Sequence, residues 1–121
     1  MIEMFGLSDQ NRQPEPPARK PNEDGLCMMG GPFPFAVVAD GIPVLRDKEG
    51  NYPRNNGAVA TGIAIKAIFE ELRGQTPDAR KLFEAIRLAN ENIGRANQEL
   101  GLFSQPAHRW MATVLVVAWI N

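Results

Sequence analysis

The apolar residues of this chain fall into short runs and into longer periodic stretches. Short runs at residues 2–8, Leu26–Met29 and Phe35–Ala39 predict three strands, because turn-forming or charged residues bound each of them. A further strand is predicted over Arg109–Ile120, where apolar side chains occupy both faces. Such a strand needs cover on both of its faces and needs strand neighbours along its edges.

Two longer stretches repeat their apolar residues at helical spacing. The first predicted helix begins near Asn56 and ends near Gly74, and its small apolar residues form two rows. These rows are Val59, Ile63 and Ala67, and Ala60, Ala64, Ile68 and Leu72. The second helix is predicted to begin at Thr76-Pro77, with Thr76 as its N-cap, and to end at Gly101. Its apolar stripe is Leu82, Ile86, Ala89, Ile93, Ala96 and Leu100, and its polar surface positions are expected at Asn90, Asn92 and Asn97.

These elements predict an α+β fold, in which an antiparallel sheet or sandwich carries two long helices on one face. The 121 residues suffice for one domain with one core, and 44% hydrophobic and 22% charged residues are ordinary for a globular protein. Within that domain, residues 10–21 contain Pro14, Pro16, Pro17 and Pro21 and predict an extended loop.

The second and third strands are expected to pair as a hairpin that brings two aspartates together. Gly30, Gly31, Pro32 and Pro34 form the turn, whose centre falls near Pro32. Asp24 and Asp40 lie equally far from that centre, so they should be cross-strand partners on one face of the sheet. Like charges placed directly opposite each other are destabilising, so this pair needs a cation, a proton or open solvent.

Each acidic segment also has an ordinary structural interpretation. An Asp at the end of a strand, such as Asp40, is often a turn former, and Asn22-Glu23-Asp24 alone is typical of a solvated loop. The matched hairpin positions and the apolar run between them favour a metal or phosphate site. A cluster of oxygen ligands suits hard cations such as magnesium, calcium or manganese.

Charge and residue usage exclude several other functions. A net charge of −1 offers no basic surface for nucleic acid or an anionic membrane. The single cysteine, Cys27, excludes an internal disulfide and a cysteine-based zinc site, and is interpreted as a small interior hydrophobe. The single histidine, His108, supports no Ser/His/Asp arrangement. There is no membrane-spanning apolar run and no signal-peptide pattern, so a cytoplasmic location is expected.

The acidic motifs and their order resemble the opening of the type-2C metal-dependent Ser/Thr protein phosphatases. The resemblance is carried by Arg19-x-x-Asn22-Glu23-Asp24 and by Val38-Ala39-Asp40-Gly41. It extends over nearly the whole chain through Phe5–Asp9, Asn56–Thr61, Leu82–Ile93 and Met111–Val116.

The resemblance implies metal-dependent hydrolysis of phosphoserine or phosphothreonine in phosphoprotein substrates. It implies that Asp40 bridges two Mn²⁺ or Mg²⁺ ions and that Gly41 offers its carbonyl to one of them. Glu23 and Asp24 would act near the metals, partly through water, while Arg19 binds the substrate phosphate. A water activated by the cations would attack phosphorus directly.

The resemblance also bears on architecture. Members of that family extend to roughly twice this length and stack two sheets between outer helices, in an αββα sandwich. This chain is therefore expected to represent the N-terminal half of such a domain, supplying strands to both sheets and the helices of one side.

An alternative is a non-catalytic, phosphatase-like interaction module. It is motivated by the short length and by Ile42 and Pro43, which stand where the family has a His or Met and then glycines. Self-association through the strand at Trp110–Ile120 is compatible with both the phosphatase and the interaction-module hypotheses.

Overall fold

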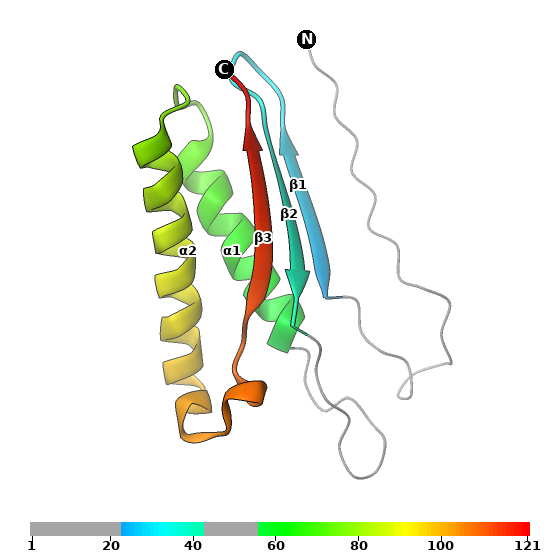
Figure 1. The fold of residues 1–121 in the computed structure, drawn as a ribbon, viewed down its shortest axis with the longest axis vertical. Helices are drawn as coiled ribbons and strands as arrows, with labels where there is room; N and C mark the ends of the chain where they lie inside the picture. The colour runs from blue at the N-terminus through cyan, green and yellow to red at the C-terminus, as the bar shows by residue number, and fades with distance from the viewer. Residues whose placement is uncertain (1–22, 43–55) are drawn as a thin grey trace, which may run out of the picture.

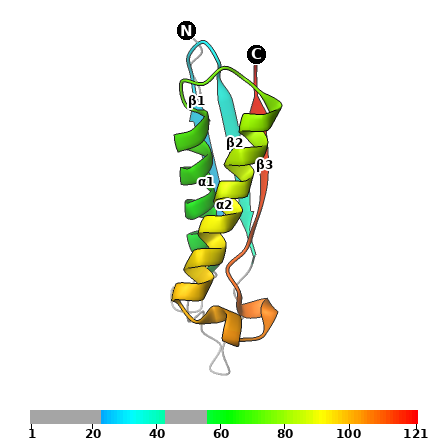
Figure 2. The same ribbon diagram turned by 90° about the vertical axis from the view of Figure 1, so that its left-hand side faces the viewer.

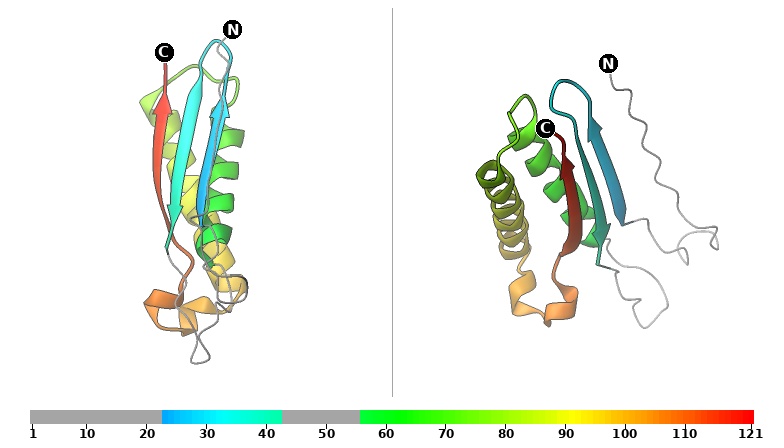
Figure 3. Two further views of the ribbon diagram at one scale, coloured as in Figure 1. Left: turned by 90° about the vertical axis from the view of Figure 1, so that its right-hand side faces the viewer. Right: turned by 45° about the horizontal axis from the view of Figure 1, so that its top comes forward.

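The computed structural model describes residues 23–42 and 56–121, which form a three-stranded sheet with two helices on one face (Figure 1). The strands are β1 (Asp24–Met29), β2 (Phe35–Gly41) and β3 (Thr113–Trp119). Both helices lie behind the sheet in the left view of Figure 3, which shows the sheet with no described element in front of it. The α+β class with two helices on one face is confirmed.

The sheet is antiparallel throughout, in the order β1-β2-β3. The β1–β2 register pairs Asp24 with Asp40 and Met29 with Phe35, so the predicted hairpin and its matched aspartates are confirmed. Along β2 burial alternates, with Phe35, Val37 and Ala39 buried against the helices. This alternation places Ala36, Val38 and Asp40 on the opposite, open face.

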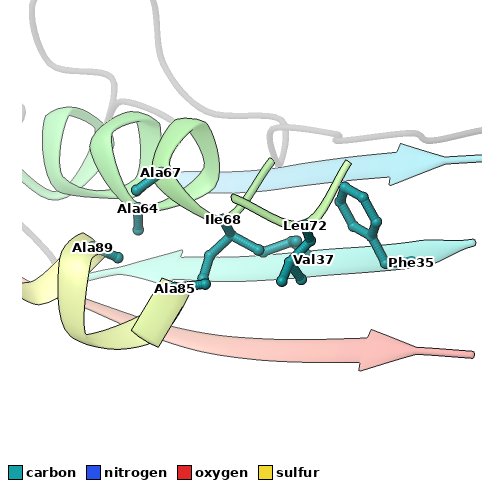
Figure 4. Packing of buried hydrophobic residues seen from close by; sticks show 8 residues of the cluster. All are labelled: Phe35, Val37, Ala64, Ala67, Ile68, Leu72, Ala85 and Ala89. Atoms are coloured by element: carbon teal, nitrogen blue, oxygen red, sulfur yellow. The ribbon is translucent and has the colours of Figure 1, made fainter. Parts of the chain in front are cut away.

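Helix α1 (Asn56–Leu72) packs on β1 and β2, and helix α2 (Ala79–Glu99) packs on α1 (Figure 2). Of the two predicted rows of α1, the one beginning at Ala60 is completely buried, whereas Val59 is 42% exposed. Small residues on this row allow α1 to approach the sheet closely. The resulting core consists of Phe35, Val37, Ala64, Ala67, Ile68, Leu72, Ala85 and Ala89 (Figure 4).

Helix α2 differs from its prediction at its start and in its buried face. Asp78, not Thr76, is the N-cap, and its carboxylate accepts a 2.7 Å hydrogen bond from the Arg80 backbone N–H. The most buried positions of α2 are Ala85, Ala89 and Asn97, while Ile86 and Leu100 of the predicted stripe are exposed.

The predicted surface position of Asn97 is wrong, because the side chain is buried and pairs with the backbone of Met111. Its Nδ2 donates to the Met111 carbonyl over 3.0 Å, and its Oδ1 accepts from the Met111 N–H over 2.7 Å. This pairing holds the segment before β3 against α2. The last strand is correspondingly shorter than Arg109–Ile120, and a 3₁₀ turn at Ala107–Arg109 precedes it.

The three described strands belong to one sheet, and no strand of a second sheet occurs within residues 23–42 and 56–121, so the two-sheet sandwich that the resemblance implies stays a prediction. The predicted strand at residues 2–8 and the Pro-rich loop at 10–21 lie outside the described residues.

Candidate functional site

Asp24 and Asp40 stand side by side where the hairpin opens. The Gly41 N–H donates to the Glu23 carbonyl over 3.1 Å, so residues 23 and 41 form a hydrogen-bonded pair of the ladder. Hydrogen-bonded and non-hydrogen-bonded pairs alternate, which makes Asp24 and Asp40 a non-hydrogen-bonded pair. The Cα atoms of such a pair are about 4.5 Å apart and its side chains are close together. Both aspartates are exposed on the open face, where two carboxylates can meet one cation or solvent.

Glu23 and Gly41 occupy the helix-facing side of the same ladder. Glu23 is only 4% exposed, and its sequence neighbour Asp24 points to the other face because side chains alternate. The structure therefore brings Asp24 and Asp40 together and places Glu23 beneath them.

Two glycines let the start of α1 meet the end of β2. A Cβ on Gly41 would lie 2.6 Å from the Gly57 carbonyl carbon and 2.8 Å from the Glu23 carbonyl oxygen. A Cβ on Gly57 would lie 2.5 Å from the Ile42 carbonyl oxygen. The backbones of β2 and α1 are thus in direct contact below the aspartates.

Two threonine hydroxyls join this contact to β3, and the sequence analysis did not assign them a role. Thr61 Oγ1 on α1 donates to the Glu23 carbonyl over 2.8 Å and lies 3.0 Å from Thr113 Oγ1. Thr113 Oγ1 in turn lies 3.0 Å from the Asp40 carbonyl. Both threonines belong to segments that carry the family resemblance. They are 52 residues apart in the sequence, and only the folded structure shows that their hydroxyls are in contact.

The rest of the open face is apolar. The register aligns Asp40 with Val114, Val38 with Val116, and Ala36 with Ala118 across β2 and β3. Val38, Val114 and Val116 are 52%, 61% and 65% exposed. The acidic pair therefore lies at one end of an otherwise apolar sheet surface. We call this whole surface the open face; its residues are Asp24, Leu26, Met28, Ala36, Val38, Asp40, Val114, Val116 and Ala118.

The donor set agrees with a hard cation but is small. Carboxylates and the Gly41 carbonyl are oxygen ligands, and Mg²⁺ is commonly held by one or two carboxylates together with water or phosphate. Within the described ranges, no group of three or more His, Cys, Asp and Glu side chains is close enough to hold a metal ion. Arg19, to which the resemblance assigns phosphate binding, lies outside the described residues.

Other chemically notable groups lie apart from the aspartates. A shallow groove of about 330 Å³ between α1 and α2 is lined by Lys66, Arg95, Glu70 and Glu99, whose charges offset one another. Cys27 is half-buried on the helix side of β1, and burial raises the pKa of its thiol, which agrees with a small interior hydrophobe.

Comparison of the chain with protein-family models, curated proteins and solved structures found no match. Neither α1 nor α2 combines the length and apolar character needed to cross a bilayer, and no other described helix does so.

Proposed function

We propose that this chain is a phosphatase-type domain whose open face binds a divalent cation, Mn²⁺ or Mg²⁺, at Asp24 and Asp40. The observation that carries the proposal is the pairing of two exposed aspartates at a non-hydrogen-bonded position. Two negative charges held this close repel each other, and a cation would convert that repulsion into attraction. The motif resemblance adds the reaction: hydrolysis of phosphoserine or phosphothreonine in a protein substrate.

In this proposal each residue has a distinct task. Asp40 and Asp24 hold the cation from the open face, and the Gly41 carbonyl adds an oxygen ligand. Glu23 acts from the buried side, and Arg19 holds the phosphoryl oxygens in bidentate fashion. A bound cation supplies a nucleophile at neutral pH by lowering the pKa of water. In the αββα arrangement that the resemblance implies, a second sheet would cover the open face.

Calorimetric titration of Mn²⁺ into the purified chain tests the proposal. We expect saturable but weak binding, with a dissociation constant of about 10⁻⁴–10⁻³ M, because two carboxylates make a sparse ligand set. Asp40→Asn should reduce the affinity about tenfold or more while it preserves the side-chain shape. Asp78→Asn is the matched control, since it removes one carboxylate far from the site and Asn remains a good N-cap.

The same samples are assayed for hydrolysis of a phosphate ester, which we expect to be slow. Absence of Mn²⁺ binding in the wild-type chain, or equal losses in Asp40→Asn and Asp78→Asn, would contradict the proposal.

A second candidate function is a non-catalytic interaction module, and the exposed apolar open face favours it. Among the described strands β3 pairs only with β2, so its other edge can accept a strand from a second copy of the chain. Residue 116 is the middle of β3, so in an antiparallel pair of two β3 strands centred there, Val116→Arg would place like charges opposite each other. We therefore expect Val116→Arg to lower the self-association measured by sedimentation velocity, and Val59→Arg on α1 to leave it unchanged. A wild-type chain that stays monomeric at all tested concentrations would refute self-association.

A further inference from the structure

The hydroxyls of Thr61 and Thr113 connect four elements at the base of the acidic pair. Thr61 is 4% exposed and projects from α1, while Thr113 begins β3. Through the carbonyls of Glu23 and Asp40 they reach the start of β1 and the end of β2. We call these two hydroxyls, with the two carbonyls, the threonine clamp.

The number of hydroxyl protons limits which hydrogen bonds of the clamp can form at the same time. Two hydroxyls supply two protons, whereas four contacts compete for them: Thr61 with Glu23, Thr61 with Thr113, and Thr113 with the carbonyls of Asp40 and Val114. If Thr61 donates to the Glu23 carbonyl, Thr113 can donate to Thr61. If instead Thr61 donates to Thr113, Thr113 donates to the Asp40 carbonyl. In a third arrangement Thr61 donates to the Glu23 carbonyl and Thr113 donates to the Asp40 carbonyl, with no proton left between the hydroxyls. Each of these three arrangements anchors at least one of the two acidic segments.

The clamp lies beside the last backbone hydrogen bonds at the end of the sheet where the hairpin opens. The Glu23 carbonyl that Thr61 contacts also accepts the Gly41 N–H over 3.1 Å. One residue further, the Ile42 N–H donates to the Ala112 carbonyl over 3.0 Å, next to Thr113. Loss of the clamp would therefore loosen the hydrogen bonds that set the distance between the Asp24 and Asp40 backbones.

We propose that Thr61 and Thr113 are positioning residues, whose paired hydroxyls fix the spacing of the Glu23–Asp24 and Asp40–Gly41 segments. The positioning of the backbone stands on the hydrogen bonds alone, and its consequence for metal affinity rests on the function proposed above. Neither threonine contacts the cation in this scheme. Each acts through the carbonyl that it holds.

Valine and serine substitutions separate the hydroxyl from the side-chain volume. Thr61→Val keeps the branched shape in the buried site and removes the hydroxyl, while Thr61→Ser keeps the hydroxyl and removes a methyl group. Thr76→Val is the control, because Thr76 is exposed in the turn between the helices. Thr113→Val and the double variant Thr61→Val/Thr113→Val test whether the two hydroxyls act as one unit.

The first readout is amide hydrogen exchange in the metal-free protein. In Thr61→Val we expect the Gly41 amide to exchange about fivefold faster, which corresponds to the net value of one hydrogen bond. The Val37 amide, in the middle of β2, should keep its rate, and so should every amide in Thr76→Val. Thr61→Ser should restore slow exchange at Gly41. An unchanged Gly41 rate in Thr61→Val, or an equal increase in Thr61→Ser, would overturn the clamp.

The second readout is Mn²⁺ titration of the same variants. We expect about tenfold weaker binding in Thr61→Val, as is typical when an outer hydrogen bond to a metal site is lost, and recovery in Thr61→Ser. The double variant should lose little more than Thr61→Val alone. If the wild type binds no Mn²⁺ while Gly41 exchange still responds to Thr61→Val, the clamp stands and the phosphatase proposal falls. If Mn²⁺ binds equally to wild type and Thr61→Val, the clamp has no role in the site.

Discussion

The contact between Gly57 and the end of β2 predicts that alanine at position 57 disturbs both the fold and the candidate site. A Cβ there would lie 2.5 Å from the Ile42 carbonyl oxygen and 3.1 Å from the Gly41 carbonyl carbon. Both neighbours are backbone atoms, so no side chain can rotate away to relieve the overlap. The start of α1 or the end of β2 must move by several tenths of an ångström.

The size of the effect follows from two opposing contributions. Overpacking of this kind costs about 1–3 kcal/mol. Replacing glycine by alanine within a helix gains about 0.5–1 kcal/mol, because the unfolded chain loses conformational freedom. Taking the middle of each range, the net expectation for Gly57→Ala is a loss of about 1 kcal/mol in the free energy of unfolding.

Gly62 provides the matched control in the same helix. A Cβ on Gly62 meets no atom within 4 Å, so only the helix-propensity contribution remains. We expect Gly62→Ala to raise the free energy of unfolding by about 0.5–1 kcal/mol.

Urea unfolding followed by circular dichroism measures both variants against the wild type, with midpoint and slope determined together. Two results would refute the reasoning: Gly57→Ala as stable as the wild type, or Gly62→Ala destabilised as much as Gly57→Ala. The Mn²⁺ affinity of Gly57→Ala should also fall, because the displaced segment carries the Gly41 carbonyl and the Asp40 backbone.

Two further predictions concern buried groups away from the site. Asn97→Ala should lower the free energy of unfolding by about 2–3 kcal/mol, because it leaves the Met111 N–H and carbonyl unpaired in a buried position. The control is Asn90→Ala on the exposed face of α2, which should have little effect in the same urea titration. For Cys27, burial raises the thiol pKa above its ordinary value of 9.0, so its contribution to stability is present below pH 9 and is lost as pH rises further. The unfolding midpoint of the wild type should therefore fall more steeply above pH 9 than that of Cys27→Ala, and equal slopes would contradict this.

The hairpin register could be predicted from the sequence because local constraints determine it. A turn of glycines and prolines fixes the centre, and the strict two-residue alternation then assigns a face to every side chain. Asp24 and Asp40 thus become partners by counting alone. The approximate bounds of both helices were predictable for a similar reason, since caps and stops such as Gly101, with φ of 66°, act over a few residues.

Contacts between distant segments were not predictable in this way. Asn97 has the composition of a surface residue, and only its position opposite Met111 makes it a buried partner for backbone groups. The hydroxyls of Thr61 and Thr113 meet only because α1 crosses the sheet at one particular place. The burial of Glu23 likewise depends on the close approach of Gly41 and Gly57, which no local sequence pattern predicts.

The acidic pair and the apolar surface are parts of one face, and this links the two candidate functions. Once Phe35, Val37 and Ala39 pack against the helices, the pleat of β2 forces Val38 and Asp40 to point the other way. A partner whose contact extends from Val38 and Val116 to Val114 and Asp40 would also remove water from around the acidic pair. Electrostatic interactions grow stronger as water is excluded, so a covered pair repels more without a cation and binds one more tightly. If the open face binds both a partner and a cation, the two would therefore change each other's affinity by the same factor.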